Sequence, residues 1–141
     1  MLILRDVKKS FVEPDGGYFY VSQPPSSGNH HPSPAGWGVY SQPVPREKYV
    51  HSEEHGGVVL VYNCPSGCQD VVDALTNLYA TAPLDPTFGE VKVVVTPDPG
   101  YDGGMVAAAS WGHVYTPATL DLVGLRCFVM LHEGRGPEQI P

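Results

Sequence analysis

The stretch YVHSEEHGGVVLVYNCP, residues 49–65, predicts how the chain turns near its centre. Its first half is polar and can belong to a helix of two to three turns over residues 46–55, which Gly56-Gly57 would end. The unbroken apolar run Val58–Tyr62 follows at once and is typical of a buried strand. The stretch therefore predicts a short helix that passes directly into a strand of the core.

Further elements are predicted on the C-terminal side of this strand. Helical spacing of apolar residues predicts a helix at about 66–80, with Ser66 as its N-cap. The valine-rich run Glu90–Thr96 and the apolar run Met105–Ser110 predict two more strands.

A last helix is expected to open at Thr116-Pro117, because proline suits the first turn, and to end at Gly134. The apolar stripe predicted for this helix consists of Leu120, Val123, Cys127, Met130 and Leu131.

The N-terminal side is expected to contribute a hairpin and a long loop. Two β-type runs, Leu2–Leu4 and Tyr18–Val21, flank the turn sequence EPDGG and favour a hairpin. Residues 23–46 are rich in proline, glycine and serine and show no periodicity. Because this segment also contains histidines and aromatic residues, we expect an ordered loop, and long ordered loops often carry function.

The order of these elements predicts the fold class. Strands and helices interleave without strict alternation, which favours an α+β fold: one mixed β-sheet with two main helices packed on one face, plus the long ordered Pro/Gly-rich loop. A chain of 141 residues fits a single domain, residues 1–141, and is long enough to bury a core without a structural metal.

Composition excludes several classes of partner. The net charge of −7 favours solubility and gives no basis for binding nucleic acid or an anionic membrane. No apolar run reaches the roughly 18 residues of a membrane-spanning helix. The N-terminus shows no signal-peptide core, and the sequence indicates neither a compartment nor a protein partner.

His51 and His55 are the first candidate metal ligands. On a helix their Cα atoms would lie roughly 6 Å apart, close enough for both imidazoles to bind one ion. On a strand the same spacing would be about 13 Å, which is too wide. The metal hypothesis therefore requires a helical or tightly turned segment here.

Other residues could complete the coordination of a transition metal, which needs at least three ligands. The preceding loop offers His30 and His31. Met105 and the thiols of Cys64 and Cys68 are softer candidates, and Met105 would favour copper over zinc. Glu54 could ligate the ion, act as a base, or fix a histidine tautomer.

Two other interpretations of these motifs compete with a simple metal site. The pattern H-x-x-E-H also occurs in zinc metalloproteases, but there the helix continues on both sides, whereas Gly56-Gly57 and a strand follow here. Cys64 and Cys68 have three residues between them, where a redox pair usually has two, so two loop thiols without a redox or metal-binding role are favoured, and the sequence leaves open whether they pair. Three cysteines leave at least one thiol unpaired, which favours a reducing compartment or a redox role without identifying either.

Several blocks in a fixed order resemble the family known as domain of unknown function 3105. The blocks are SSGNHHP, GWGVYSQPVP, VHSEEHGGVVLVY, SWG and a final GPE, and they cover about residues 24–138. The sequence departs from the family pattern at Ser110, where alanine is usual, and at Ser52-Glu53, where Asn-Leu is usual. The resemblance names no activity, but His30, His51, Glu54 and His55 fall on motif positions, whereas His31, His113 and His132 do not.

These observations together predict a transition-metal-binding domain with a three-histidine site for one copper or zinc ion. The predicted ligands are His30, His51 and His55, with Met105 and Glu54 as further candidates. One alternative is a structural or protein-interaction domain in which the histidines and glutamates form a hydrogen-bond knot. A second alternative is a metal-dependent hydrolase or oxidoreductase that uses Glu54 as base.

Overall fold

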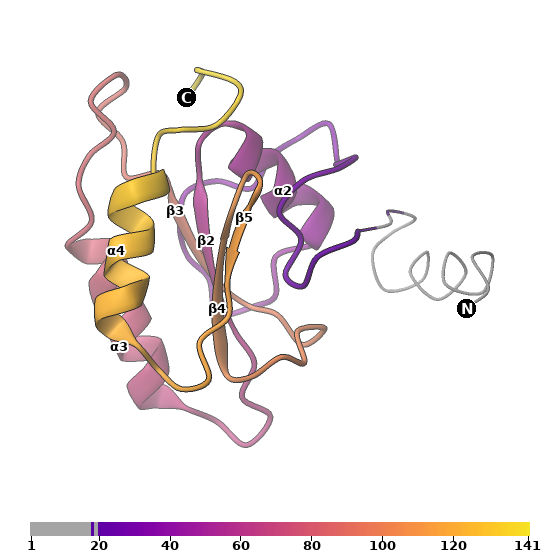
Figure 1. The fold of residues 1–141 in the computed structure, drawn as a ribbon, viewed down its shortest axis with the longest axis vertical. Helices are drawn as coiled ribbons and strands as arrows, with labels where there is room; N and C mark the ends of the chain where they lie inside the picture. The colour runs from indigo at the N-terminus through magenta and orange to yellow at the C-terminus, as the bar shows by residue number, and fades with distance from the viewer. Residues whose placement is uncertain (1–17, 19) are drawn as a thin grey trace.

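The computed structural model describes residues 18 and 20–141, and its centre is one five-stranded sheet (Figure 1). The elements, in chain order, are β1 (Gly38–Val39), α2 (Arg46–Glu54), β2 (Val58–Tyr62), α3 (Gln69–Ala80), β3 (Val93–Pro97), β4 (Val106–Ser110), β5 (His113–Tyr115) and α4 (Leu122–His132).

The sheet is mixed, with strand order β1-β3-β2-β4-β5. β3 is parallel to both β1 and β2, whereas β4 is antiparallel to both β2 and β5. β2 is the central strand, and four of its five residues are buried, as its unbroken apolar run predicts. The α+β class and the mixed sheet are confirmed.

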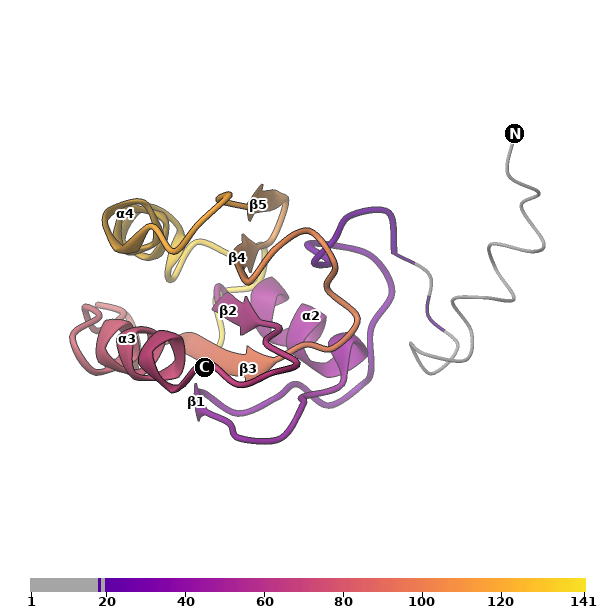
Figure 2. The same ribbon diagram turned by 90° about the horizontal axis from the view of Figure 1, so that it is seen from below.

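Two layers of helix cover the sheet. α3 and α4 pack on one face, where Leu75, Leu78 and Leu125 meet the valines of β2 and β3. α2 and the loop that precedes it cover the other face, where Tyr49 and Val50 are fully buried (Figure 2). None of the helices in the described part of the chain is long and apolar enough to cross a membrane.

The helix starts differ from the prediction. α3 begins at Gln69 rather than near residue 66, because Cys64 and Cys68 form a disulfide and Cys68, not Ser66, is the N-cap. α4 begins at Leu122 rather than at Pro117, because the Asp121 side chain caps it by accepting a bond from Gly124 N at 3.0 Å.

The predicted apolar stripe of α4 was wrong. Leu125, Phe128 and Val129 face the core, whereas Val123 and Met130 are 77% and 62% exposed. The helix sequence LVGLRCFVMLH is apolar on most sides, so spacing did not select the buried face. Contact with α3 and the sheet selects it.

The strand predictions were right in the core and incomplete at the edges. β2 and β4 lie where predicted, β3 begins three residues later than expected, and the short edge strands β1 and β5 were not predicted. Of the expected N-terminal hairpin, Leu2–Leu4 and the turn lie outside the described residues. Tyr18, Tyr20 and Val21 belong to no strand.

A buried charged pair fixes the first turn of α2. Arg46 Nε donates to both oxygens of Asp98, at 3.2 and 3.1 Å, and Tyr49 OH donates to Asp98 Oδ2 at 2.9 Å. Since Asp98 follows β3 directly, these bonds tie the helix to the carboxyl end of that strand. They determine the angle at which α2 crosses the sheet and hence where its last turn lies.

Glu53 is the least expected residue of α2. It is fully buried, and neither carboxylate oxygen has a hydrogen-bond partner among the described residues. Burial raises the pKa of this carboxyl group well above its ordinary value. The fold therefore favours the neutral acid at this position.

We expect Glu53→Gln to flatten the pH dependence of stability. A raised folded-state pKa gives stability that is fully present below the unfolded pKa of 4.5 and is lost as pH rises through the folded pKa. Between these two pKa values, the free energy of unfolding of the wild type should fall by up to about 1.4 kcal/mol per pH unit relative to that of the variant. Urea unfolding of both proteins in metal-free buffer from pH 4.5 to 8 measures this difference, and parallel curves would contradict it.

Candidate metal centre

The last turn of α2 presents three candidate ligands on one side. His51, Glu54 and His55 are three and four residues apart, so they share a helix face. The imidazoles of His51 and His55 lie 4.6 Å apart between ring centroids, at an interplanar angle of 86°. The helical segment that the metal hypothesis requires is present.

The loop before α2 brings His30 to this face. Its ring centroid lies 4.6 Å from that of His51, and its Nε2 lies 3.1 Å from Glu54 Oε1. The backbone on either side is pinned, because Tyr20 OH donates to Asn29 O at 2.7 Å and His31 N donates to Glu47 O at 2.9 Å. This part of the Pro/Gly-rich loop thus holds a defined position against α2.

Glu138 joins the cluster and was not among the predicted ligands. Its Oε1 lies 3.4 Å from His55 Nε2. One ligand atom each of His51, Glu54, His55 and Glu138 lies within 4.8 Å of the others. The signal that pointed to Glu138 was the final GPE block, which the sequence shares with the family it resembles.

The histidines share one pattern of hydrogen bonding. The Nδ1 atoms of His30, His51 and His55 face backbone oxygens of Gly28, His31 and Pro141 at 2.9, 2.7 and 3.0 Å. A carbonyl oxygen only accepts, so each Nδ1 carries a proton and donates it. In the neutral imidazole the lone pair is then on Nε2, the atom that faces Glu54 in His30 and Glu138 in His55.

The Nε2 atom of His55 is especially informative. It is buried and has no hydrogen-bond partner among the described residues, and 3.4 Å to Glu138 is an ion-pair distance rather than a hydrogen bond. Buried nitrogen atoms of this kind are rarely left without a partner. A cation bound between His55, His51 and the carboxylates would provide one.

The donor atoms of the cluster lie somewhat farther apart than the donor atoms around a bound metal ion. Metal–ligand bonds of about 2.0–2.2 Å place neighbouring donors roughly 3.4 Å apart in a tetrahedral site. The present spread of up to 4.8 Å would have to contract on binding. Glu138 can make that movement most readily, because its side chain is 47% exposed, whereas His55 is held within the structure.

Met105 does not reach this centre. It precedes β4 at the end of the sheet where Asn63 N donates to its carbonyl, whereas the cluster lies near Trp111, beyond the other end of that strand. Figure 1 shows α2's last turn and the chain before β4 at opposite ends of the sheet.

The remaining histidines and cysteines also lie elsewhere. His31 Nδ1 accepts a bond from Ser33 N, and His113 stacks on His132 at 4.3 Å between β5 and α4. Cys64 and Cys68, whose pairing the sequence left open, are bonded to each other, so neither can ligate a metal as a thiolate. Cys127 is free and exposed.

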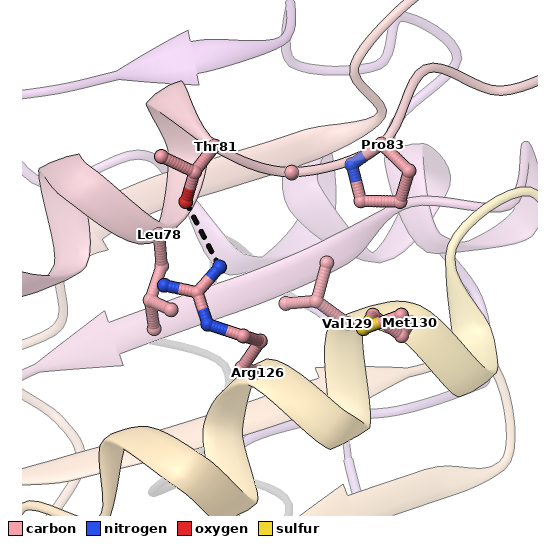
Figure 3. A pocket seen from close by; sticks show the side chains of 7 residues that line it. Leu78, Thr81, Pro83, Arg126, Val129 and Met130 are labelled. Carbon is pink, nitrogen blue, oxygen red and sulfur yellow. Dashed lines mark hydrogen bonds between the residues drawn. The ribbon is translucent and has the colours of Figure 1, made fainter.

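A pocket between α3 and α4 is separate from the metal centre. It lies on the opposite face of the sheet from α2 and has a volume of about 190 Å³ (Figure 3). Leu78, Pro83 and Val129 make it apolar, and Arg126 donates across it to Thr81 at 2.9 Å. Its lining includes no histidine, carboxylate or cysteine.

The sequence model of the family described as "Protein of unknown function (DUF3105)" matches residues 12–141. The match covers nearly the whole chain, so the protein belongs to this family and the resemblance seen in the sequence is confirmed. No curated protein and no solved structure matches the chain.

We expect His51 and His55 to be Nδ1–H tautomers in the metal-free protein at pH 8, because their Nδ1 atoms donate to backbone oxygens. Long-range ¹H–¹⁵N correlation NMR on the imidazole rings distinguishes the two tautomers. His113, whose imidazole makes no hydrogen bond within the described part of the chain, is the internal control and should show a mixture of tautomers. An Nε2–H form at His51 or His55 would contradict the hydrogen-bonding pattern.

Proposed function

We propose that this member of the DUF3105 family binds one transition-metal ion, zinc or copper(II), through His51, His55, Glu54 and Glu138, with His30 as a fifth donor. The observation that carries the proposal is that one ligand atom each of His51, Glu54, His55 and Glu138 lies within 4.8 Å of the others, while backbone oxygens orient both histidines at Nδ1. Metal-bound histidines in proteins are commonly fixed by this kind of hydrogen bond.

The donor types support zinc or copper(II) over copper(I). Imidazole nitrogen and carboxylate oxygen suit divalent ions of borderline character, whereas copper(I) favours thiolate and thioether. The one thioether that the sequence suggested, Met105, lies at the other end of the sheet. Glu54 faces His30 and the two histidines of its own helix, so we assign it as a ligand rather than as a general base.

His30 contacts Glu54 in the metal-free protein. Both of its ring nitrogens face oxygens, Gly28 O at 2.9 Å and Glu54 Oε1 at 3.1 Å, so an ion bound by His30 would replace the contact with Glu54. Because metal ligands bind in their deprotonated forms, binding should weaken as pH falls.

Metal analysis of the purified protein tests the proposal. We expect a stoichiometric amount of zinc or copper after reconstitution, and a fall in affinity of at least roughly tenfold to a hundredfold in His51→Ala and in His55→Ala. His30→Ala should lower affinity less, because His30 is not one of the four residues whose ligand atoms lie within 4.8 Å of one another. His132→Ala is the matched control and should bind as the wild type does.

Metal content that stays substoichiometric after reconstitution would overturn the proposal in favour of a structural role. One observation favours that second function: His30 pairs with Glu54 and His55 with Glu138 without any ion. If these pairs serve only as a hydrogen-bond knot, His30→Ala should lower the melting temperature equally with and without added zinc. Under the metal proposal, zinc should raise the melting temperature of the wild type and less so that of the variant.

A further inference from the structure

Lys92 is the one buried lysine of the described residues, and it lies next to the candidate metal centre. It is 1% exposed, and its Nζ donates to His55 O and to Ile140 O, each at 2.8 Å. The ammonium also lies 4.5 Å above the centre of the Phe88 ring. A fully buried lysine is rare unless its charge is satisfied, so these contacts indicate a dedicated position.

The two carbonyl groups that Lys92 bridges belong to the two segments that form the candidate centre, the end of α2 and the C-terminal segment. His55 ends α2, and Ile140 belongs to the C-terminal segment, residues 133–141. Backbone bonds join the same two parts: Gly134 N donates to Gly56 O at 2.7 Å, and Glu138 N donates to Glu54 O at 3.0 Å. The C-terminal segment therefore lies directly on the end of α2, as Figure 1 shows.

The C-terminal segment gives the centre two things. It contributes the Glu138 carboxylate, and its Pro141 oxygen accepts the Nδ1 proton of His55. Ile140, which lies next to Pro141 and two residues after Glu138, is the residue whose carbonyl accepts a hydrogen bond from Lys92. One ammonium group thus fixes both the carboxylate ligand and the tautomer of the buried histidine ligand.

We propose that Lys92 is the positioning residue of the metal centre, acting through the C-terminal segment on Glu138 and His55. The inference rests on the proposed metal function. Lys92 touches no ligand atom, so its effect on binding is indirect.

If Lys92 acted only through its charge, removing the charge would change metal affinity in the opposite direction. A fixed ammonium close to a divalent ion repels it, so removing the charge would strengthen metal binding. Removing a positioning group would weaken it, because Glu138 and the Pro141 oxygen would no longer be held. The direction of the change therefore separates the two roles.

Lys92→Met keeps the length of the side chain and removes the ammonium. We expect zinc affinity, measured by chelator competition, to fall at least roughly tenfold, the loss typical of a supporting residue at a metal site. The absorption spectrum of bound Co²⁺ should change because a ligand is lost or displaced. Combined with Glu138→Gln, the two losses should be less than additive, because both remove the same contact.

Gly136→Ala tests the same inference without touching the lysine. A Cβ at this position would lie 2.3 Å from Gly56 N and 2.4 Å from Glu54 O, so it must lift the C-terminal segment from α2. We expect the same fall in zinc affinity and the same change in the Co²⁺ spectrum as in Lys92→Met. This variant keeps the test decisive if Lys92→Met fails to fold.

Lys48→Met is the control, because it removes a lysine from α2 without disturbing the C-terminal segment, and it should bind zinc as the wild type does. Unchanged or stronger zinc binding in folded Lys92→Met or Gly136→Ala, with normal binding in the wild type, would overturn the inference alone. A wild type that binds neither zinc nor copper would overturn the proposed function and the inference with it.

Discussion

The rest of the structure depends on the direct passage from α2 into the central strand β2 through Gly56 and Gly57. Gly56 has a φ of 96°, which favours glycine, and a Cβ at Gly57 would lie 2.5 Å from the Trp37 ring and 2.8 Å from Ser52 O. Only glycine therefore lets the helix end and the buried strand begin within two residues. His55 is thereby attached to the strand that pairs with both β3 and β4, so its position follows from the sheet rather than from a loop.

Buried cations hold α2 at both ends. Arg46 meets Asp98 in the first turn, and the Lys92 ammonium donates to two carbonyl groups at the last. Breaking a buried charged contact is costly because the remaining group stays buried and unsatisfied. Both ends of the helix are thus held, and three candidate ligands on one face lie close together without any metal. Such preorganisation lowers the entropic cost of ordering these side chains when an ion binds.

The sequence pattern predicted those elements whose conformation depends on neighbouring residues alone. The helix over 46–55 and the strand at 58–62 follow from periodicity and from the glycine pair, and the shared face of His51 and His55 follows from helical geometry. The buried face of α4 could not be predicted, because an apolar helix has several equivalent faces until α3 packs against it. Met105 was placed by donor chemistry alone, and only the antiparallel register of β4 shows that it lies at the wrong end of the sheet.

Glu138 illustrates what sequence spacing cannot provide. It lies far along the chain from His55, in a segment with no periodicity, and its approach depends on backbone bonds and on Lys92. The centre is therefore made of a rigid half, from α2 and its preceding loop, and a half that docks onto it. If the proposed ion binds, contraction from the present 4.8 Å to metal-bonding distances would come from the docked half, since α2 is held at both ends. An ion bound there would lie at the junction of two segments, so the strength of their contact would set how tightly it is held.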